Sequence, residues 1–161
     1  MDEKRLTHLD DEGRLKMVDV GDKERTARVA RVRGEICMQP TTAALIAQNR
    51  VAKGNVLEVA RLAGIMAAKR TGDLIPLCHP LNITAVDIDF TLKSDRVQVE
   101  AQARIDDRTG VEMEALAGAS VGALAVIDMV KGVDRSAMID EVVLIEKSGG
   151  RSGHYVRDES A

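Results

Sequence analysis

Four charged residues flank a long uncharged segment of the chain. Glu112 and Glu114 stand before the run 115–127, and Asp128 and Lys131 follow it. Asp128 and Lys131 are three positions apart, which places them on one face of a helix and within reach of each other. Such a pair is by default a solvated ion pair, but beside a desolvated segment it can transfer protons near neutral pH. Asp128 and Lys131 are therefore candidates for acid–base catalysis.

The uncharged segment itself is predicted to be one buried helix with charged ends. Thr109 and Glu112 have the spacing of a capping box, which predicts a helix start there. Acidic residues also complement the dipole at a helix start, an alternative that explains Glu112 better than Glu114. Gly118 and Gly122 each cost roughly 1 kcal/mol relative to alanine, so another backbone is expected to approach them closely. The run is too short and too rich in glycine and serine to predict a membrane span.

The length of this helix restricts any shared site. Glu114 and Asp128 are fourteen residues apart, or ~21 Å at 1.5 Å per residue. They cannot line one small pocket within a single chain. A helix that is apolar on every side must also be covered on every side. We therefore expect the chain's own sheet on one side, a second subunit on the other, and a site assembled from two chains.

A second candidate site lies in the segment TGDLIPLCHP, where Cys78 and His79 are held between two prolines. The sequence supports a catalytic or ligand-binding histidine about as well as a structural one. No zinc site is predicted, because the other soft ligands show no metal-binding spacing with this pair. Those ligands are Cys37, His8 and His154.

Basic residues gather in the predicted loops. Lys147 lies in KSGGRSG, where glycines allow backbone amides to approach an anion. This is a weak phosphate signal, and solvated surface lysines remain the alternative. The cluster comprises Lys53, Lys69, Arg70, Arg108, Lys147 and Arg151.

Composition narrows the class of protein. The 161 residues are 45% hydrophobic and 30% charged, as expected of a soluble globular domain. A net charge of −3 and a single Phe and Tyr argue against nucleic-acid binding, which favours basic surfaces and aromatic platforms. Two cysteines without a CxxC pair and a charged N-terminus predict a cytoplasmic protein with no membrane association. Residues 1–22 are predicted to be a flexible arm, and residues 23–161 a single domain.

The pattern of elements predicts an α+β fold. The order is strand, two helices, hairpin, helix, strand, which is a ferredoxin-like βαββαβ antiparallel sheet with helices on one face and an extra helix. A bulge is expected near Gly34 in the first strand. The expected ranges are strand 26–38, helices 41–50 and 55–70, a loop 71–80, hairpin strands 81–92 and 96–106, the central helix, and strand 136–147.

Several ordered motifs resemble one family. The chain contains LTH, MVDV, AGIMAAKRT, DLIPLCHPL, TGVEMEAL, DMVK and KSGGRSG between about Leu6 and Tyr155. Together they resemble the cyclic pyranopterin monophosphate synthase family, molybdenum cofactor biosynthesis protein C. Two departures stand out: Gly72 occupies the usual position of a tryptophan, which puts the rigidity of the loop in doubt, and Gly118 replaces a small polar residue or alanine.

The resemblance implies an enzyme. Family members are homohexamers, trimers of dimers, that convert (8S)-3′,8-cyclo-7,8-dihydroguanosine 5′-triphosphate to cyclic pyranopterin monophosphate and release pyrophosphate. The resemblance makes Asp128 and Lys131 catalytic. No dedicated cofactor or metal is expected, although Mg²⁺ could accompany the triphosphate. The substrate-binding residues that it implies are Leu77, Cys78, His79, Glu112, Met113, Glu114, Lys53 and Lys147.

One alternative is a binding module. An oligomeric ferredoxin-like domain could bind a nucleotide through the same basic loops without turning it over. That reading gives no reason for Asp128 and Lys131 at the end of a buried helix.

Overall fold

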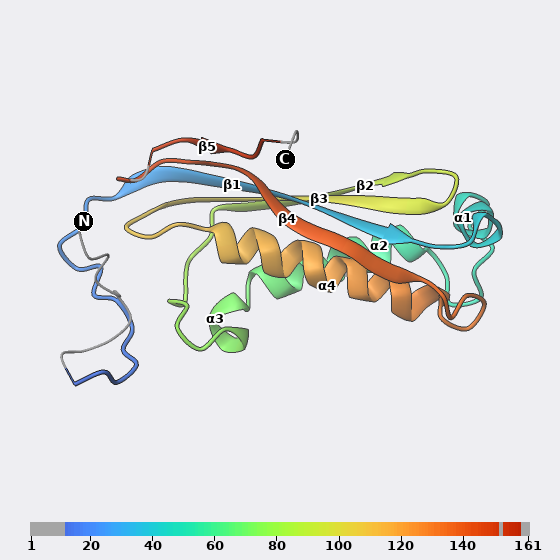
Figure 1. The fold of residues 1–161 in the computed structure, drawn as a ribbon, viewed down its shortest axis with the longest axis horizontal. Helices are drawn as coiled ribbons and strands as arrows, with labels where there is room; N and C mark the ends of the chain where they lie inside the picture. Colours follow the sequence, from blue (N-terminus) through green and yellow to red (C-terminus); the bar gives the residue numbers. More distant parts are fainter. Residues whose placement is uncertain (1–11, 152, 159–161) are drawn as a thin grey trace.

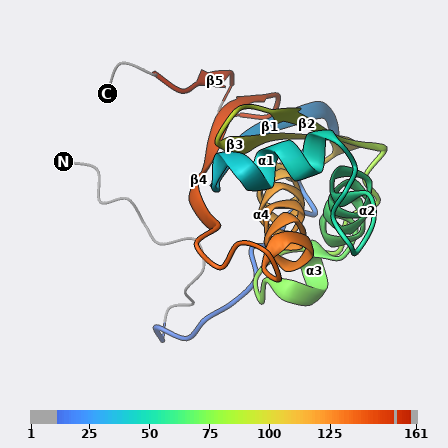
Figure 2. The same ribbon diagram turned by 90° about the vertical axis from the view of Figure 1, so that its right-hand side faces the viewer.

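The computed structural model describes residues 12–151 and 153–158. A single antiparallel sheet carries two long helices, α2 and α4, on one face, and α1 lies across one end (Figure 1, Figure 2). The elements are β1 (Thr26–Cys37), α1 (Pro40–Ala47), α2 (Val56–Ala68), α3 (Thr71–Leu74), β2 (Ala85–Leu92), β3 (Arg96–Asp107), α4 (Glu112–Val130), β4 (Met138–Ser148) and β5 (Tyr155–Val156).

The strand order confirms the predicted α+β fold. Strands lie in the order β2-β3-β1-β4-β5, and every neighbouring pair is antiparallel. The first four strands have the ferredoxin-like arrangement, while β5 extends the edge from the glycine-rich tail, where no strand was expected. The register between β1 and β4 shifts at two places, where the unpaired residues are Ile145 and Asp140 of β4. The bulge expected in the first strand near Gly34 was therefore wrong: β1 pairs with β3 without interruption, and the bulges lie in the neighbouring strand.

The two faces of the sheet differ because side chains alternate along each strand. The inward residues of β3 are those predicted, and all are buried: Val97, Val99, Ala101, Ala103 and Ile105. The outer face is charged and carries ion pairs between strands. They include Arg31 with Glu100 and Glu146, Arg33 with Glu141, and Arg96 with Glu35.

Glycines set the spacing between α2 and α4. A Cβ added at Gly64 would lie 2.8 Å from the carbonyl oxygen of Gly118, and one at Gly118 would lie 3.4 Å from the carbonyl oxygen of Gly64. A Cβ at Gly122 would meet nothing nearer than 3.5 Å. The close backbone approach predicted from these helix glycines is therefore confirmed, and the approaching backbone is α2 of the same chain.

We predict that Gly64→Ala lowers the free energy of unfolding by roughly 1–3 kcal/mol, because the new methyl meets a backbone oxygen that cannot rotate away. Gly122→Ala is the matched control. It has room for a methyl and gains up to about 1 kcal/mol of helix propensity. Urea unfolding of both variants measures the difference. Equal free energies of unfolding for Gly64→Ala and Gly122→Ala would contradict the close contact between Gly64 and the Gly118 carbonyl.

Several boundaries differ from the prediction. The segment 71–80 was predicted as a loop, but Thr71–Leu74 forms a helical turn, because the Thr71 hydroxyl bonds back to the Ala68 carbonyl and extends the end of α2. The strand expected from residue 81 begins at Ala85. The first helix ends at Ala47, two residues before Asn49 takes a left-handed φ of 51°.

Within residues 12–151 and 153–158, one side of α4 carries exposed apolar side chains. The helix packs against the sheet and α2, yet the Leu124 and Met113 residues are 55% and 37% exposed. On α2, Leu62 and Met66 are 60% and 50% exposed. By length and composition α4 could cross a membrane, so the expectation that it is too short was wrong; in the fold it is a partly buried core helix.

Candidate active site

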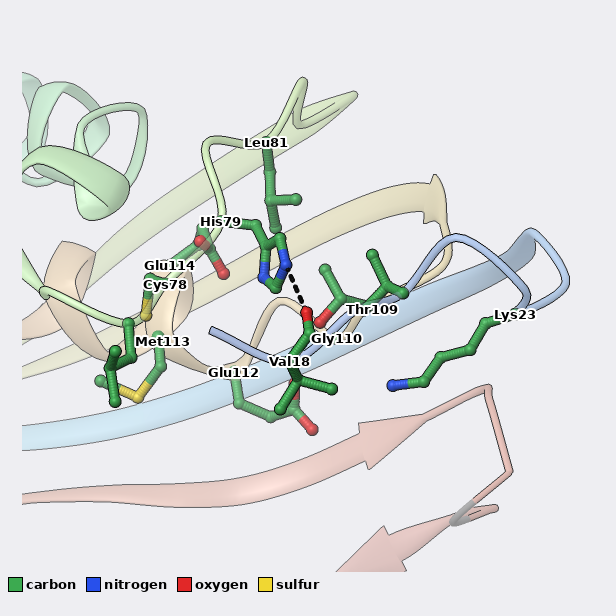
Figure 3. A pocket seen from close by; sticks show the side chains of 12 residues that line it. Val18, Lys23, Cys78, His79, Leu81, Thr109, Gly110, Glu112, Met113 and Glu114 are labelled. Atoms are coloured by element: carbon green, nitrogen blue, oxygen red, sulfur yellow. Dashed lines mark hydrogen bonds between the residues drawn. The ribbon is translucent and has the colours of Figure 1, made fainter. Parts of the chain in front are cut away.

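A pocket of about 350 Å³ opens beside the start of α4. Its walls come from three segments that are distant in sequence: the arm before β1, the loop after α3, and the first turn of α4 (Figure 3). This volume lies within the range of small-molecule sites, roughly 300–1,000 Å³. The lining residues are Val18, Val20, Lys23, Leu77, Cys78, His79, Leu81, Thr109, Gly110, Glu112, Met113 and Glu114.

Glu114 is the buried acid of this pocket. Only 3% of the residue is exposed, and burial raises the pKa of its carboxyl to about 6. Burial also raises the pKa of the neighbouring Cys78 thiol, and the charge of Glu114 adds to that effect. Cys78 is therefore a neutral thiol near pH 7 rather than a nucleophilic thiolate. Glu114 can change its protonation state close to neutral pH.

The titration of Glu114 should make the free energy of unfolding depend on pH. The folded state holds this proton more tightly than the unfolded chain, so stability falls as pH rises from about 4.5 to about 6. We predict that Glu114→Gln raises the free energy of unfolding by about 2 kcal/mol at pH 8 and has little effect at pH 4. Unfolding at both pH values measures this, with the exposed Glu24→Gln as control. An equal effect at the two pH values would contradict it.

His79 holds the arm over the pocket. Its Nε2–H donates a hydrogen bond of 2.9 Å to the carbonyl oxygen of Val18, which fixes the ring across the opening (Figure 3). Val18 belongs to the arm that was predicted to be flexible. Residues 1–11 of that arm lie outside the described part of the chain, and the flexibility of the rest stays a prediction.

The first turn of α4 differs from the predicted cap. The helix begins at Glu112, Val111 occupies the N-cap position, and no side chain caps it. The capping box of Thr109 and Glu112 was therefore wrong. The Glu112 carboxylate turns instead toward Lys147 of β4, at 3.1 Å. This ion pair links the end of β4 to the pocket.

A second hollow continues from the pocket and shares Lys23, Thr109 and Gly110 with it. It measures about 720 Å³ and is lined by the basic residues Lys23, Arg28, Arg108 and Arg151, together with acidic residues of the arm. The Arg28 guanidinium donates to the backbone carbonyls of Asp107 and Arg108, so its position is fixed. Lys23 and Arg28 were missed in the sequence, because a basic residue in an arm or a strand has no local signature.

The other candidate residues form a cluster at the far end of α4. Lys131 Nζ lies 2.7 Å from Asp128 Oδ1, and Lys53 Nζ lies 2.9 Å from Asp128 Oδ2. Lys53 also donates to the Asp128 backbone carbonyl at 2.7 Å. The hydrogen bonds from Lys131 and Lys53 lower the pKa of Asp128 to about 2. Asp128 is therefore a carboxylate at neutral pH, and its side chain is 55% exposed within this one chain.

The structure thus divides the predicted site residues into two groups. Leu77, Cys78, His79, Glu112, Met113 and Glu114 line the pocket, and Lys147 adjoins it. Lys53, Asp128 and Lys131 meet at the opposite end of α4. Figure 1 shows the full length of this helix between its two ends. The helix is continuous from Glu112 to Val130, so the calculated separation of ~21 Å between Glu114 and Asp128 applies within one chain.

Comparison with known proteins places this arrangement in a family. The MoaC family profile matches residues 17–150, which include the pocket and the charged cluster. The chain belongs to the MoaC family. Among its MoaC relatives, the cyclic pyranopterin monophosphate synthase of Thermomicrobium roseum is 53% identical over 156 residues, 96% of this chain and 94% of the relative. The enzyme of the same name from Parvibaculum lavamentivorans is 54% identical over 154 residues, 94% of this chain and 96% of the relative.

Gly72 lies against the loop that lines the pocket. A Cβ added at Gly72 would lie 3.1 Å from Pro80 Cα and 3.2 Å from Pro80 N. The backbone after His79 therefore packs directly on Gly72, and any larger side chain would require Pro80 to move. Glu114 lies between the main pocket and a hollow of about 120 Å³ beside Gly72.

The side chains that could bind a metal ion are not grouped in the described part of this MoaC chain. Within residues 12–151 and 153–158, no group of three or more His, Cys, Asp or Glu side chains is placed to hold one. Cys37 and Cys78 are both free thiols.

Proposed function

We propose that this chain is a cyclic pyranopterin monophosphate synthase, a phosphorus–oxygen lyase of molybdenum cofactor biosynthesis. Its substrate would be (8S)-3′,8-cyclo-7,8-dihydroguanosine 5′-triphosphate, and its products cyclic pyranopterin monophosphate and pyrophosphate. One observation carries this proposal: the span matched to the family contains both the pocket and the charged cluster. Relatives that bear this enzyme name match nearly the whole chain.

The pocket suits the ring portion of that substrate. Glu114 and the neutral Cys78 thiol can exchange hydrogen bonds with a purine-derived ring, and Glu114 can gain or lose a proton during ring opening and pterin assembly. His79 would position the ring by closing the arm over it. The adjoining basic hollow would receive the triphosphate through Lys23 and Arg28.

The charged cluster suits the phosphate chemistry. A sugar hydroxyl must attack the phosphorus nearest the sugar while the bond to pyrophosphate breaks. Asp128 would accept the hydroxyl proton, and the Lys131 ammonium would stabilise or protonate the departing pyrophosphate. Lys53 would hold the phosphates and keep Asp128 ionised. A Mg²⁺ ion would arrive with the triphosphate rather than reside in the protein.

Both groups of residues can act on one substrate only if two chains form the site. We propose a dimer in which the start of one α4 faces the end of its partner's α4, and a hexamer built from three such dimers. The exposed apolar residues of α4 and α2 support this, because a second subunit would cover them. We place the enzyme in the cytoplasm.

A turnover assay with the cyclised nucleotide tests the function. Release of pyrophosphate and formation of the cyclic phosphate are expected, and GTP, which lacks the new carbon–carbon bond, serves as the control substrate. Tight binding of the cyclised nucleotide without pyrophosphate release would favour the alternative of a binding module.

A further inference from the structure

Asp134 lies in the loop between α4 and β4 and is almost completely buried, with 2% of the residue exposed. Its Oδ2 accepts hydrogen bonds from the Gln39 backbone N–H at 2.8 Å and from the Thr42 hydroxyl at 3.0 Å. Its Oδ1 accepts from the backbone N–H and the hydroxyl of Ser136, at 2.9 and 2.6 Å. These donors lower the pKa of Asp134 to about 2, the hydroxyl of Ser136 first. The residue is therefore a buried carboxylate at neutral pH.

This carboxylate joins two segments that are far apart in the sequence. Gln39 and Thr42 stand at the start of α1, which has no cap of its own, because the Gln39 side chain makes no capping hydrogen bond. Asp134, 95 residues away in the sequence, accepts from the backbone N–H of the N-cap residue Gln39 itself, the donor that a residue in the first turn accepts in a capping box. Its own loop is fixed at the same time, because its backbone N–H donates to the Val130 carbonyl.

Each of the joined segments carries a lysine of the charged cluster. Lys53 follows α1 in the chain, two residues after the buried Val51. Lys131 precedes Asp134 by three residues, and the two residues between them are exposed. Both lysines have long, exposed side chains that meet on Asp128. The contacts of Lys53 with Asp128 therefore depend on how α1 and the loop that follows it lie relative to the end of α4. Asp134 provides a direct hydrogen-bonded link between these two elements.

We propose that Asp134 is a positioning residue that holds the Lys53 segment against the end of α4, so that Lys53, Asp128 and Lys131 meet in one arrangement. This inference rests on the proposed function for its effect on turnover. Asp134 acts through the two lysines and touches no substrate. Asparagine at position 134 would have the same shape but would break the link, because each carboxylate oxygen accepts two hydrogen bonds and the NH₂ group that replaces one of them cannot accept any.

The test compares Asp134→Asn with Asp140→Asn, which removes the same charge from an exposed position of β4. Turnover of the cyclised nucleotide by full-length protein is measured well below the melting temperature. Asp134→Asn is expected to lower kcat 10- to 100-fold, because displacement of reacting groups by about 1 Å costs about that much. Asp140→Asn should leave kcat unchanged.

A second measurement separates positioning from a general loss of stability. Trace acetylation followed by mass spectrometry gives the reactivity of Lys53 relative to Lys93, which pairs with Glu35 on the outer face of the sheet. Asp134→Asn should raise this ratio, because Lys53 leaves its partners. A purely structural role would raise the reactivity of both lysines together.

Thr42→Val provides the milder variant if Asp134→Asn does not fold. It removes one hydroxyl donor, keeps the side-chain volume, and should raise the Lys53 to Lys93 ratio while lowering kcat severalfold. An unchanged ratio in a folded variant would overturn the proposal, as would a raised ratio with full kcat. If the wild-type protein releases no pyrophosphate, the proposed function fails, and the ratio alone then decides whether Asp134 holds Lys53 in place.

Discussion

Asp128→Ala and Lys131→Ala are each expected to lower pyrophosphate release by roughly 10²- to 10⁴-fold, the usual contribution of a general acid or base. Asp128 is a carboxylate held between the amines of Lys53 and Lys131, so its loss separates the two lysines and, in the proposed mechanism, removes the proton acceptor. In the proposed mechanism, loss of Lys131 removes the cation that stabilises the departing pyrophosphate. Pyrophosphate release under saturating cyclised nucleotide measures both effects.

Binding and folding should survive these two changes. The side chains of Asp128 and Lys131 are 55% and 61% exposed, so alanine leaves no cavity in the core of the chain. Nucleotide binding by calorimetry and particle size by light scattering should therefore match the wild type. Asp140→Ala and Lys93→Ala provide charge-matched controls away from the cluster. Full turnover by either site variant would remove that residue from the mechanism.

Mixing two inactive variants should restore activity. Glu114→Ala damages the pocket at the start of α4, and Asp128→Ala damages the cluster at its end. If each site takes one end from each of two chains, a mixed dimer contains one site with both ends intact and one with neither. Random assortment makes half of the dimers mixed, so about a quarter of all sites should become active.

The recovery experiment requires subunits to exchange. The two chains are therefore unfolded together and refolded, or expressed together with different affinity tags. A chain carrying both Glu114→Ala and Asp128→Ala, mixed with wild type, is the control, because it leaves each mixed dimer without an intact site. No recovery in the first mixture would show that a single chain holds its whole site, and the proposed dimer would be wrong.

Patterns in the sequence predicted the elements well where a periodic signal was present. The alternation of Val97, Val99, Ala101, Ala103 and Ile105 gave the buried face of β3 correctly, because one face of an open sheet must be apolar. The long uncharged helix and its glycine contacts were also foreseen. The start of that helix was predicted incorrectly, because the Glu112 carboxylate pairs with Lys147, which is distant in the sequence, instead of forming a capping box.

The site was less predictable than the fold. The spacing of Glu114 and Asp128 indicated two separate ends, and the structure has this separation. No pattern in the sequence indicated the hydrogen bond between His79 and Val18, or the position of Arg28 in the basic hollow. Both depend on how segments that are distant in the sequence meet in space. Asp134 looked like an ordinary loop residue, because two of its donors, Thr42 and Gln39, lie 92 and 95 positions away.

The apolar length of α4 also bears on how the chain is made. This helix follows β1 and β3 in the chain but precedes β4, against which it also packs. During synthesis it leaves the ribosome before β4 exists, with an apolar surface long enough to attract other nonpolar chains or a lipid surface. Rapid docking on the hairpin already formed by β2 and β3 would protect the nascent protein from aggregation.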